Sequence, residues 1–292
     1  SPLLGGFGHC IEKRSGVDRS PAQKFREIVR SRQHVGHTSG CVPGFLQANV
    51  VVLPREYAFD FLMFCLRNPK PCPLLDVIES DTGEPSILAP GANITTDIPR
   101  YRIYRNGSVA EEVDSISSLW SSQLSVGTGG MVGFLLGCSF SWEQDLVDAG
   151  LTPRHIEEGR NVPMFRTTVP NVRSGPFGGC LVVSMRPYLP ADIPRASAIT
   201  ARYPAAHGDP IAHGADGAAR LGISIDRLDR PDYGDAVTLQ PGEVPVFWAC
   251  GVTPQAALEA AGSSVPIAAT HAPGHMFVSD LRVDETRVSS AP

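Results

Sequence analysis

Two segments of the chain share a strand–turn–helix pattern, which limits the possible fold more than any other feature of the sequence. The first begins with the apolar run Met131–Leu136 and turns at Gly137-Cys138. The second begins with Val246–Ala249 and turns at Cys250-Gly251. A short apolar run followed by a tight turn and a helix is the unit from which α/β sheets are built. We therefore expect an α/β fold in which both turns lie at the same edge of one sheet.

The helix of each unit has signals at its ends. Ser141 and Gln144 have the spacing of a capping box, and Gly150 is placed to end the first helix. Thr253 is placed as the N-cap of the second helix, just before a proline. The expected helices cover residues 142–149 and 255–261.

Hydrophobic periodicity predicts further elements along the chain. Helices are expected over 21–32, 55–67 and 194–201, and strands over 50–53, 163–169, 181–185 and 276–278. Asn106-Gly107, between two strand-like runs, predicts a tight hairpin. The helix over 55–67 has apolar residues nearly all the way round and one polar stripe, so we expect it to be mostly buried. Gly127–Gly130 predicts a joint.

Together these elements predict an α/β protein with a mixed sheet between flanking helices, in a three-layer arrangement. The stretch between the two units holds two strands and a helix, which indicates a smaller α+β inserted domain. The expected main domain covers residues 1–153 and 208–292, and the inserted domain covers 154–207. A chain of 292 residues has room for one large domain or two modest ones.

Composition excludes several classes of function. Lys and Arg number 25 against 30 Asp and Glu, a net charge of −5, so there is no basic footprint for nucleic acid. The longest apolar run, 131–136, is too short for a membrane span of ~20 residues. Seven cysteines without a C-x-x-C pair favour reduced thiols in a cytosol-like compartment. We expect a cytoplasmic protein, or a mitochondrial-matrix protein if the source is eukaryotic.

Residues 155–161 concentrate ionisable and amide side chains in a short space. A carboxylate of Glu157 or Glu158 could move a proton, and Arg160, beside Asn161, could clamp a substrate carboxylate with two N–H groups. The alternative is a solvated turn held by local ion pairs, in which no side chain meets a substrate.

His271 and His275 lie four residues apart. On a helix they would share a face and could bind a metal, but Pro273-Gly274 between them prevents a regular helix. A loop that presents one or two neutral imidazoles as acid–base groups is therefore favoured over a metal site. A histidine held by hydrogen bonds in a turn is the remaining alternative. We expect no cofactor and no bound metal.

Cys138 and Cys250 occupy the two turns, facing the expected helix N-termini. A helix N-terminus lowers the pKa of a thiol and attracts anions, so each turn could activate a thiolate or dock a carboxylate. The alternative is that small residues merely fill a tight turn. The sequence contains no G-x-G-x-x-G, G-x-x-x-x-G-K-[ST] or G-x-S-x-G, so nucleotide-cofactor and serine-hydrolase functions lose their main support.

Six segments resemble one protein family, in order along the chain. They are residues 43–77, 134–143 (FLLGCSFSWE), 155–167 (HIEEGRNVPMFRT), 182–187, 242–258 and 270–281 (THAPGHMFVSDL). The chain resembles the D-glutamate cyclase family, whose bacterial members are labelled hydro-lyases. The resemblance implies a two-part α/β protein of amino-acid metabolism that closes D-glutamate to 5-oxo-D-proline and releases water. The segment 121–133 is longer and richer in glycine than the resemblance leads us to expect.

This reaction suggests roles for the candidate residues. Arg160 or Arg186 would hold the α-carboxylate, while a glutamate or His275 would take a proton from the ammonium group. Backbone N–H groups in the two turns would stabilise the oxyanion, and a cysteine could act as an acyl carrier on a less favoured covalent route. The candidate catalytic residues are Glu157, Glu158, His275, Cys138 and Cys250, and the candidate substrate-binding residues are Arg160, Asn161, Arg186, Gly137, Gly251 and His271.

Three other functions stay open at this point. The chain could be a hydro-lyase acting on a hydroxy acid, a metal-assisted hydrolase using His271 and His275, or a carboxylate-binding module without turnover. In each case the expected partner is a small-molecule carboxylate rather than nucleic acid or membrane. A homo-oligomer is compatible with all of them.

Overall fold

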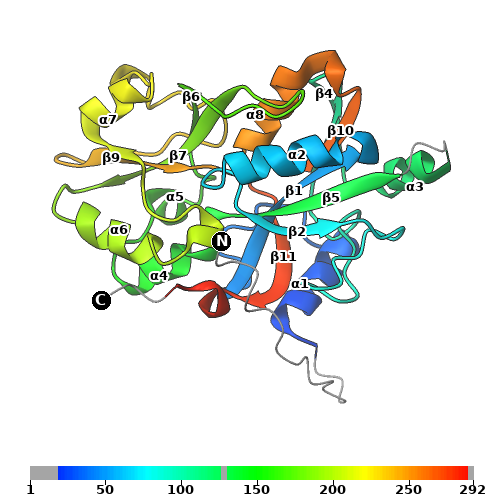
Figure 1. The fold of residues 1–292 in the computed structure, drawn as a ribbon. Coiled ribbons are helices and arrows are strands. Elements are labelled where there is room, and N and C mark those ends of the chain that lie inside the picture. Colours follow the sequence, from blue (N-terminus) through cyan, green and yellow to red (C-terminus); the bar gives the residue numbers. More distant parts are fainter. Residues whose placement is uncertain (1–18, 126–129, 289–292) are drawn as a thin grey trace.

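The strands of the protein form two antiparallel sheets, here called sheet A and sheet B. A computed structural model describes residues 19–125 and 130–288 (Figure 1). Sheet A has the order β2-β5-β1-β10-β3-β4, with β11 also paired to β1, and sheet B has the order β6-β7-β9-β8. Sheet A contains β1 (Phe45–Pro54), β2 (Leu74–Ile78), β3 (Tyr101–Arg105), β4 (Ser108–Val113), β5 (Met131–Gly137), β10 (Ile267–His271) and β11 (Phe277–Arg282). Sheet B contains β6 (Met164–Pro170), β7 (Cys180–Tyr188), β8 (Ala212–His213) and β9 (Val244–Ala249).

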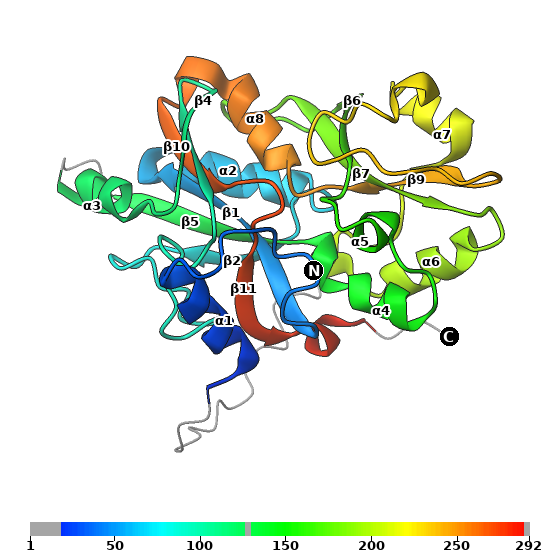
Figure 2. The same ribbon diagram turned by 180° about the vertical axis from the view of Figure 1, so that it is seen from behind.

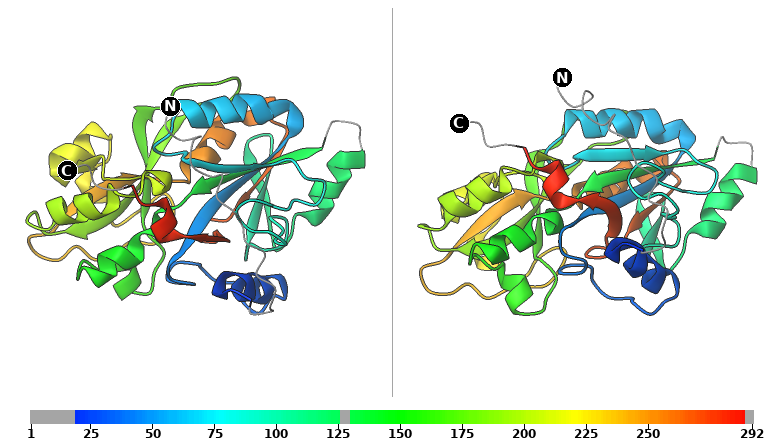
Figure 3. Two further views of the ribbon diagram at one scale, coloured as in Figure 1. Left: turned by 60° about the horizontal axis from the view of Figure 1, so that its bottom comes forward. Right: turned by 90° about the horizontal axis from the view of Figure 1, so that it is seen from below.

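Helices cover both faces of each sheet. They are α1 (Pro21–Arg30), α2 (Arg55–Arg67), α3 (Ser117–Ser125), α4 (Glu143–Asp148), α5 (Arg154–Glu157), α6 (Ile193–Thr200), α7 (Gly214–Arg220) and α8 (Thr253–Ala261). Apolar side chains of α2 and α8 pack on one face of sheet A and those of α3 on the other, with α1 also below the sheet (Figure 3). Sheet B lies between α4 and α6 on one face and α7 on the other. The predicted α/β class and its layers of helix and sheet are confirmed.

The expected mixture of parallel and antiparallel strands is not found among the described strands, because every pairing in both sheets is antiparallel. The two strand–turn–helix units explain this. The first leads from β5 in sheet A through α4 and α5 to β6 in sheet B, and the second leads from β9 in sheet B through α8 to β10 in sheet A. Each unit therefore crosses between sheets instead of returning parallel to its own strand. The expectation that both turns lie at one edge of one sheet is wrong.

The structure confirms the predicted start of α1 and the predicted turn between β3 and β4. Ser20 and Gln23 form a capping box at α1, with Pro21 in the first turn. The hairpin between β3 and β4 turns at Asn106 and Gly107, whose φ angles of 51° and 79° require the residues that tolerate a left-handed backbone.

Other sequence signals predicted the correct helix but not its burial or its N-cap. Helix α2 has the predicted bounds, yet Phe59 and Leu66 are 71% and 58% exposed, so it is not mostly buried. Ser141 does not cap α4, because its hydroxyl accepts the backbone N–H of Gln47 at 3.0 Å. Thr253 does not cap α8 either, since its hydroxyl accepts the N–H of Val182 at 3.0 Å. Both hydroxyls fasten one element to a distant strand.

Sheet B also bears on the predicted domain boundaries. Its strands run from Met164 to Ala249. Strand β9 pairs with β7 of the proposed inserted domain, and β8 pairs with β9, although the prediction assigns β8 and β9 to the main domain. Residues 127–129 of the predicted glycine joint lie outside the described residues. Within the described ranges, no helix is long and apolar enough to cross a bilayer.

Gly137 allows a test of how closely β5 approaches the segment that precedes β8. An ideal Cβ on Gly137 would lie 1.6 Å from the backbone oxygen of Ala205. We expect Gly137→Ala to lower the free energy of unfolding, measured in urea, by about 1–3 kcal/mol, because backbone must shift to admit the methyl group. The control is Gly36→Ala, whose Cβ would meet nothing closer than a His34 carbon at 3.8 Å. Equal stability of the two variants would contradict the close approach.

Candidate active site

The two Gly/Cys turns meet at the junction between the sheets, although they end strands of different sheets (Figure 2). Cys138 and Cys250 belong to one buried apolar cluster. Its other members include Phe140, Val162, Val252 and Met276. The predicted proximity of the turns is therefore correct, and the predicted sheet is not.

Asn49 on β1 contacts both turns. Its Nδ2 donates to the backbone oxygen of Gly137 at 2.7 Å. An ideal Cβ on Gly251 would lie 2.0 Å from the same nitrogen, so only glycine leaves room for the Asn49 amide. The two glycines thus shape the junction through their lack of a side chain.

A buried ion cluster of Glu143 on α4, Arg186 on β7 and His155 on α5 lies beside the turns. Arg186 Nη2 donates to Glu143 Oε1 at 2.7 Å, and His155 Nε2 lies 3.0 Å from the same oxygen. The other oxygen of Glu143 accepts from Ser39 Oγ at 3.1 Å. Because the three charged or ionisable residues are at most 3% exposed, little water screens these contacts.

Arg186 is enclosed on every side. Its guanidinium carbon lies 4.6 Å from the ring centroid of Trp142 and 5.4 Å from that of Trp248. Its N–H groups also donate to Ser184 Oγ and Ser139 Oγ, each at 3.1 Å. Arg186 was expected to hold a substrate carboxylate, but its carboxylate partner in the structure is the side chain of Glu143.

The surroundings of Glu143 keep it ionised. Burial raises the pKa of its carboxyl, but the charges and hydrogen bonds of His155 and Arg186 outweigh burial and lower the pKa to about 2. A buried carboxylate that faces an imidazole can orient the ring and stabilise its protonated form. The cluster therefore sets the His155 ring against an ionised carboxylate.

A pocket of about 260 Å³ borders Glu143. It is lined by Gly40–Phe45, Gln47, Phe140, Ser141, Glu143, Gln144, Val147 and Ile156. The loop on one wall has positive φ at Gly40, Val42 and Gly44, with values of 72°, 49° and 83°. A β-branched residue rarely adopts such a backbone, and it persists only where the surrounding structure holds it. The pocket wall is therefore a fixed rather than an adaptable loop.

The structure places Glu157, Glu158 and Arg160 on the outer side of this region. Glu157 is paired with Arg154 at 3.1 Å, and Glu158 lies 3.6 Å from Arg160 and accepts a backbone N–H at 3.1 Å. Arg160 donates to a backbone oxygen at 2.5 Å. The segment thus has the contacts expected for the alternative interpretation, a turn held by local ion pairs.

The thiols of the two turns are shielded rather than activated. Burial raises the pKa of Cys138 far above its ordinary value and raises that of Cys250 to about 11. Backbone N–H groups of the turns do face the two sulfurs and oppose the shift, but desolvation outweighs them. The sequence predicted a lowered thiol pKa, and this prediction is wrong because both pKa values are raised. The N–H groups that were expected to bind an oxyanion contact the two sulfurs instead.

His271 is a structural histidine of sheet A. It is fully buried on β10, and its Nδ1 accepts the backbone N–H of Val50 at 3.0 Å. Burial lowers its pKa to about 3, so the ring is neutral at physiological pH. Among residues 19–125 and 130–288, no three His, Cys, Asp or Glu side chains are grouped as metal ligands would be.

His275, by contrast, lies near the 155–161 segment. Its ring centroid is 4.9 Å from that of His37, and an ideal Cβ on Gly274 would lie 2.8 Å from Asn161 Nδ2. Asn161 is 4% exposed, and its Oδ1 has no partner among the described residues. Burial, and to a lesser extent the neighbouring His37, lowers the pKa of His275 below its ordinary value, although backbone hydrogen bonds oppose the shift. The structure thus brings His275 and Asn161 together beside the cluster of the two thiols.

Four polar residues of this region were not assigned roles from the sequence. Asn49 and Gln47 stand in an apolar strand, and Glu143 ends the mostly apolar string 134–143. His155 was noted only as part of a polar segment. Asn49, Gln47 and Glu143 could have been found as polar side chains inside an apolar run, because a buried polar group needs a partner.

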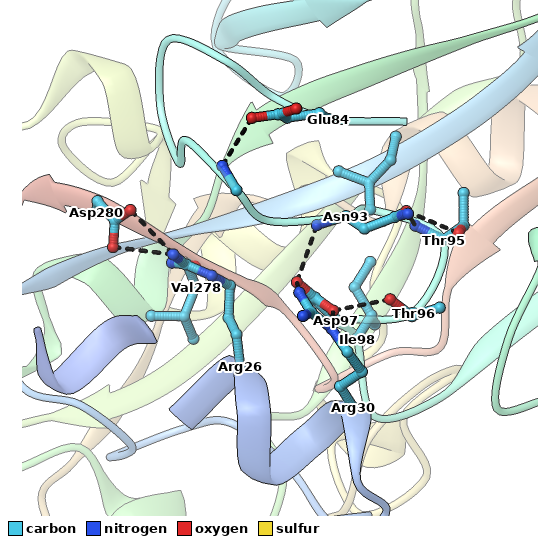
Figure 4. Close-up of polar contacts among 12 residues, drawn as sticks. Arg26, Arg30, Glu84, Asn93, Thr95, Thr96, Asp97, Ile98, Val278 and Asp280 are labelled. Carbon is cyan, nitrogen blue, oxygen red and sulfur yellow. Dashed lines mark hydrogen bonds and ion pairs between the residues drawn. The ribbon is translucent and has the colours of Figure 1, made fainter. Parts of the chain in front are cut away.

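A second pocket, of about 240 Å³, lies beside α1 and is lined by Arg19, Arg26 and Arg30. Figure 4 shows that two of these guanidiniums already hold carboxylates: Arg26 contacts Asp280 at 2.9 Å and Arg30 contacts Asp97 at 2.5 Å. Arg19 pairs with a glutamate of α1 at 2.6 Å. The Arg26–Asp280 pair fastens α1 to β11 of sheet A, and the Arg30–Asp97 pair fastens it to the loop before β3. None of the three arginines is unpaired.

The lowered pKa of Glu143 predicts an acid-sensitive contribution to stability. The carboxyl has a pKa of about 2 in the folded protein and near 4.5 when unfolded, so its ionised form stabilises the fold above pH 4.5. That contribution, about 3 kcal/mol at ~1.4 kcal/mol per pH unit, is lost as the pH falls toward 2. Glu143→Gln should lower the free energy of unfolding at pH 7 by about 3–5 kcal/mol, because Arg186 is left buried without a partner.

Urea unfolding at a series of pH values checks this expectation. The Glu143→Gln variant should lose part of the acid dependence between pH 4.5 and 2 that the wild-type protein shows. Glu56→Gln, at an exposed position of α2, is the matched control and should retain that dependence. Identical pH profiles of the wild type and Glu143→Gln would refute the role of the cluster.

Comparison with known proteins agrees with this architecture. Residues 132–280 match the family model described as D-glutamate cyclase. A Rubrobacter xylanophilus protein named "Putative hydro-lyase" is 52% identical over 267 residues, which cover 91% of this chain and 98% of that protein. A Jannaschia protein of the same name is 52% identical over 265 residues (90% and 94%), and Bacillus subtilis "Putative hydro-lyase YcsI" is 49% identical over 263 residues (90% and 97%). These matches support a hydro-lyase, and the chain belongs to the D-glutamate cyclase family.

Proposed function

We propose that the protein is a hydro-lyase that closes D-glutamate to 5-oxo-D-proline. The amino nitrogen attacks the γ-carboxyl carbon, a C–N bond forms and a C–O bond breaks. The nitrogen loses two protons in the course of the reaction, and both leave with the departing oxygen as water. Membership of the D-glutamate cyclase family supports this choice of substrate, and the hydro-lyase names of the relatives support the loss of water.

The observation that carries the proposal is the buried Glu143–His155 pair, in which Glu143 lines a small pocket and His155 lies behind it. An ammonium group is not a nucleophile until it loses a proton, so the reaction needs a base. Glu143 is ionised and lies against His155, which makes His155 the proton acceptor and Glu143 its positioning residue. The proton held by His155 is then available for the leaving oxygen.

The shape of the pocket supports an intramolecular reaction. Phe140 and Ile156 contribute apolar surface that can press the methylene groups of the substrate into a folded conformation. Closing a five-membered ring needs little more than the correct alignment of amine and carboxyl, so positioning supplies much of the rate. A covalent cysteine intermediate adds little to such a reaction, in keeping with the raised pKa values of both thiols.

His275 is the second candidate for the base, because it is half-buried beside Asn161 and near the two turns. Arg160 remains the proposed partner of a substrate carboxylate at the outer side, with Arg186 acting through Glu143.

The activity itself can be tested with purified protein. Incubation with D-glutamate should consume primary amine and produce an equal amount of 5-oxoproline, measured with an amine-reactive dye and by mass spectrometry. D-Aspartate is the control, because its closure would give a strained four-membered ring, and L-glutamate tests the stereochemical preference. Binding without loss of amine would favour the carboxylate-binding module, and dehydration of a hydroxy acid would favour the other hydro-lyase.

Two matched substitutions identify the base. His155→Asn should lower kcat by about 10²–10⁴-fold with a smaller change in KM, because proton transfer is needed in the transition state rather than in binding. His275→Asn should retain much more of kcat. Urea unfolding of both variants verifies that they are folded. A larger loss of kcat in the folded His275→Asn variant than in His155→Asn would reverse the assignment.

A further inference from the structure

Gln47 has an amide whose orientation the fold determines. It lies on β1 in the wall of the pocket and is 2% exposed. Its Nε2 donates to the backbone oxygens of Thr38 at 2.9 Å and Cys41 at 3.2 Å. Turning the amide over would place oxygen against two oxygens, so Nε2 must face the loop and Oε1 must face away from it.

The oxygen of this amide has no hydrogen-bond partner among the described residues. A buried acceptor without a donor costs roughly 1–3 kcal/mol, so its persistence calls for a ligand or ordered water. The same wall contains the ionised Glu143, and none of the described residues that line the pocket is a lysine or an arginine. The lining therefore presents oxygen acceptors, which suit the N–H groups of an ammonium better than a carboxylate.

We infer that Gln47 accepts an N–H of the substrate ammonium, so that the amino acid enters the pocket amine first. The inference rests on the proposed function, and it adds a specificity-determining residue and a direction of binding. The ammonium is thereby placed at the end of the pocket that contains Glu143, next to the His155 that takes its proton. The carboxylates remain toward the mouth of the pocket.

The loop that forms the mouth is held by the same amide. The two bonds from Gln47 Nε2 fix Thr38 and Cys41 on either side of Gly40, and the strained backbone at Val42 follows directly. Gln47 therefore preorganises the wall with its nitrogen and leaves its oxygen for the ligand, which reduces the ordering that binding requires.

The test compares two ligands that differ only in the amino group, D-glutamate and glutarate. Dissociation constants are measured by rapid-mixing tryptophan fluorescence, before turnover. Wild-type protein should bind D-glutamate about ten- to a hundredfold more tightly than glutarate, because hydrogen bonds to charged groups contribute about 1.5–3 kcal/mol. In Gln47→Leu this ratio should fall to near one. Damage to the loop would weaken both ligands alike and cancel in the ratio.

One further variant sharpens the test. Gln33→Leu changes an exposed glutamine outside the pocket and should leave the ratio unchanged. An unchanged ratio in Gln47→Leu, or no preference in the wild type, would overturn the inference even if D-glutamate is cyclised. A ratio that depends on Gln47 without any 5-oxoproline would support it while refuting the proposed reaction.

Discussion

The contact between Glu143 and Arg186 is the interaction on which the functional region depends. Glu143 follows sheet A on α4, Arg186 lies within β7 of sheet B, and both are buried. Neither charge can be left alone in such surroundings, because an uncompensated buried ion costs several kcal/mol. The pair therefore sets the distance between the two sheets, and His155 and two serine hydroxyls are arranged around it.

The crossing of the two strand–turn–helix units explains why a site can form here. Each unit leaves one sheet and arrives in the other, so both tight turns are brought to the same junction from opposite sides. Asn49 fits between the turns because Gly251 has no side chain, and it donates to the backbone oxygen of Gly137. The pocket lies beside this rigid junction, where a carboxylate, an imidazole and an amide can be held in fixed positions.

Burial decided which of the reactive residue types can take part in chemistry. Two thiols and one imidazole, Cys138, Cys250 and His271, became protonated or neutral structural groups because desolvation disfavours their charged forms. Glu143 is equally buried, yet it stays charged because Arg186 and His155 both lie within 3.0 Å of its carboxylate. The difference lies in the neighbours rather than in the residue type, and the neighbours come from other parts of the chain.

The sequence by itself determined the local elements. The capping box at Ser20, the bounds of α2 and the Asn106-Gly107 turn are set by hydrogen bonds and backbone preferences within a few residues. The family resemblance was also readable, because it rests on long strings in a fixed order. Tertiary structure alone decided that the two units join different sheets, that Ser141 and Thr253 bond to distant strands, and that Glu143 and Gln47 border the pocket. The hydrogen bonds of Ser141 and Thr253 and the Glu143–Arg186 ion pair join residues 94, 71 and 43 positions apart, and no local pattern specifies partners at such separations.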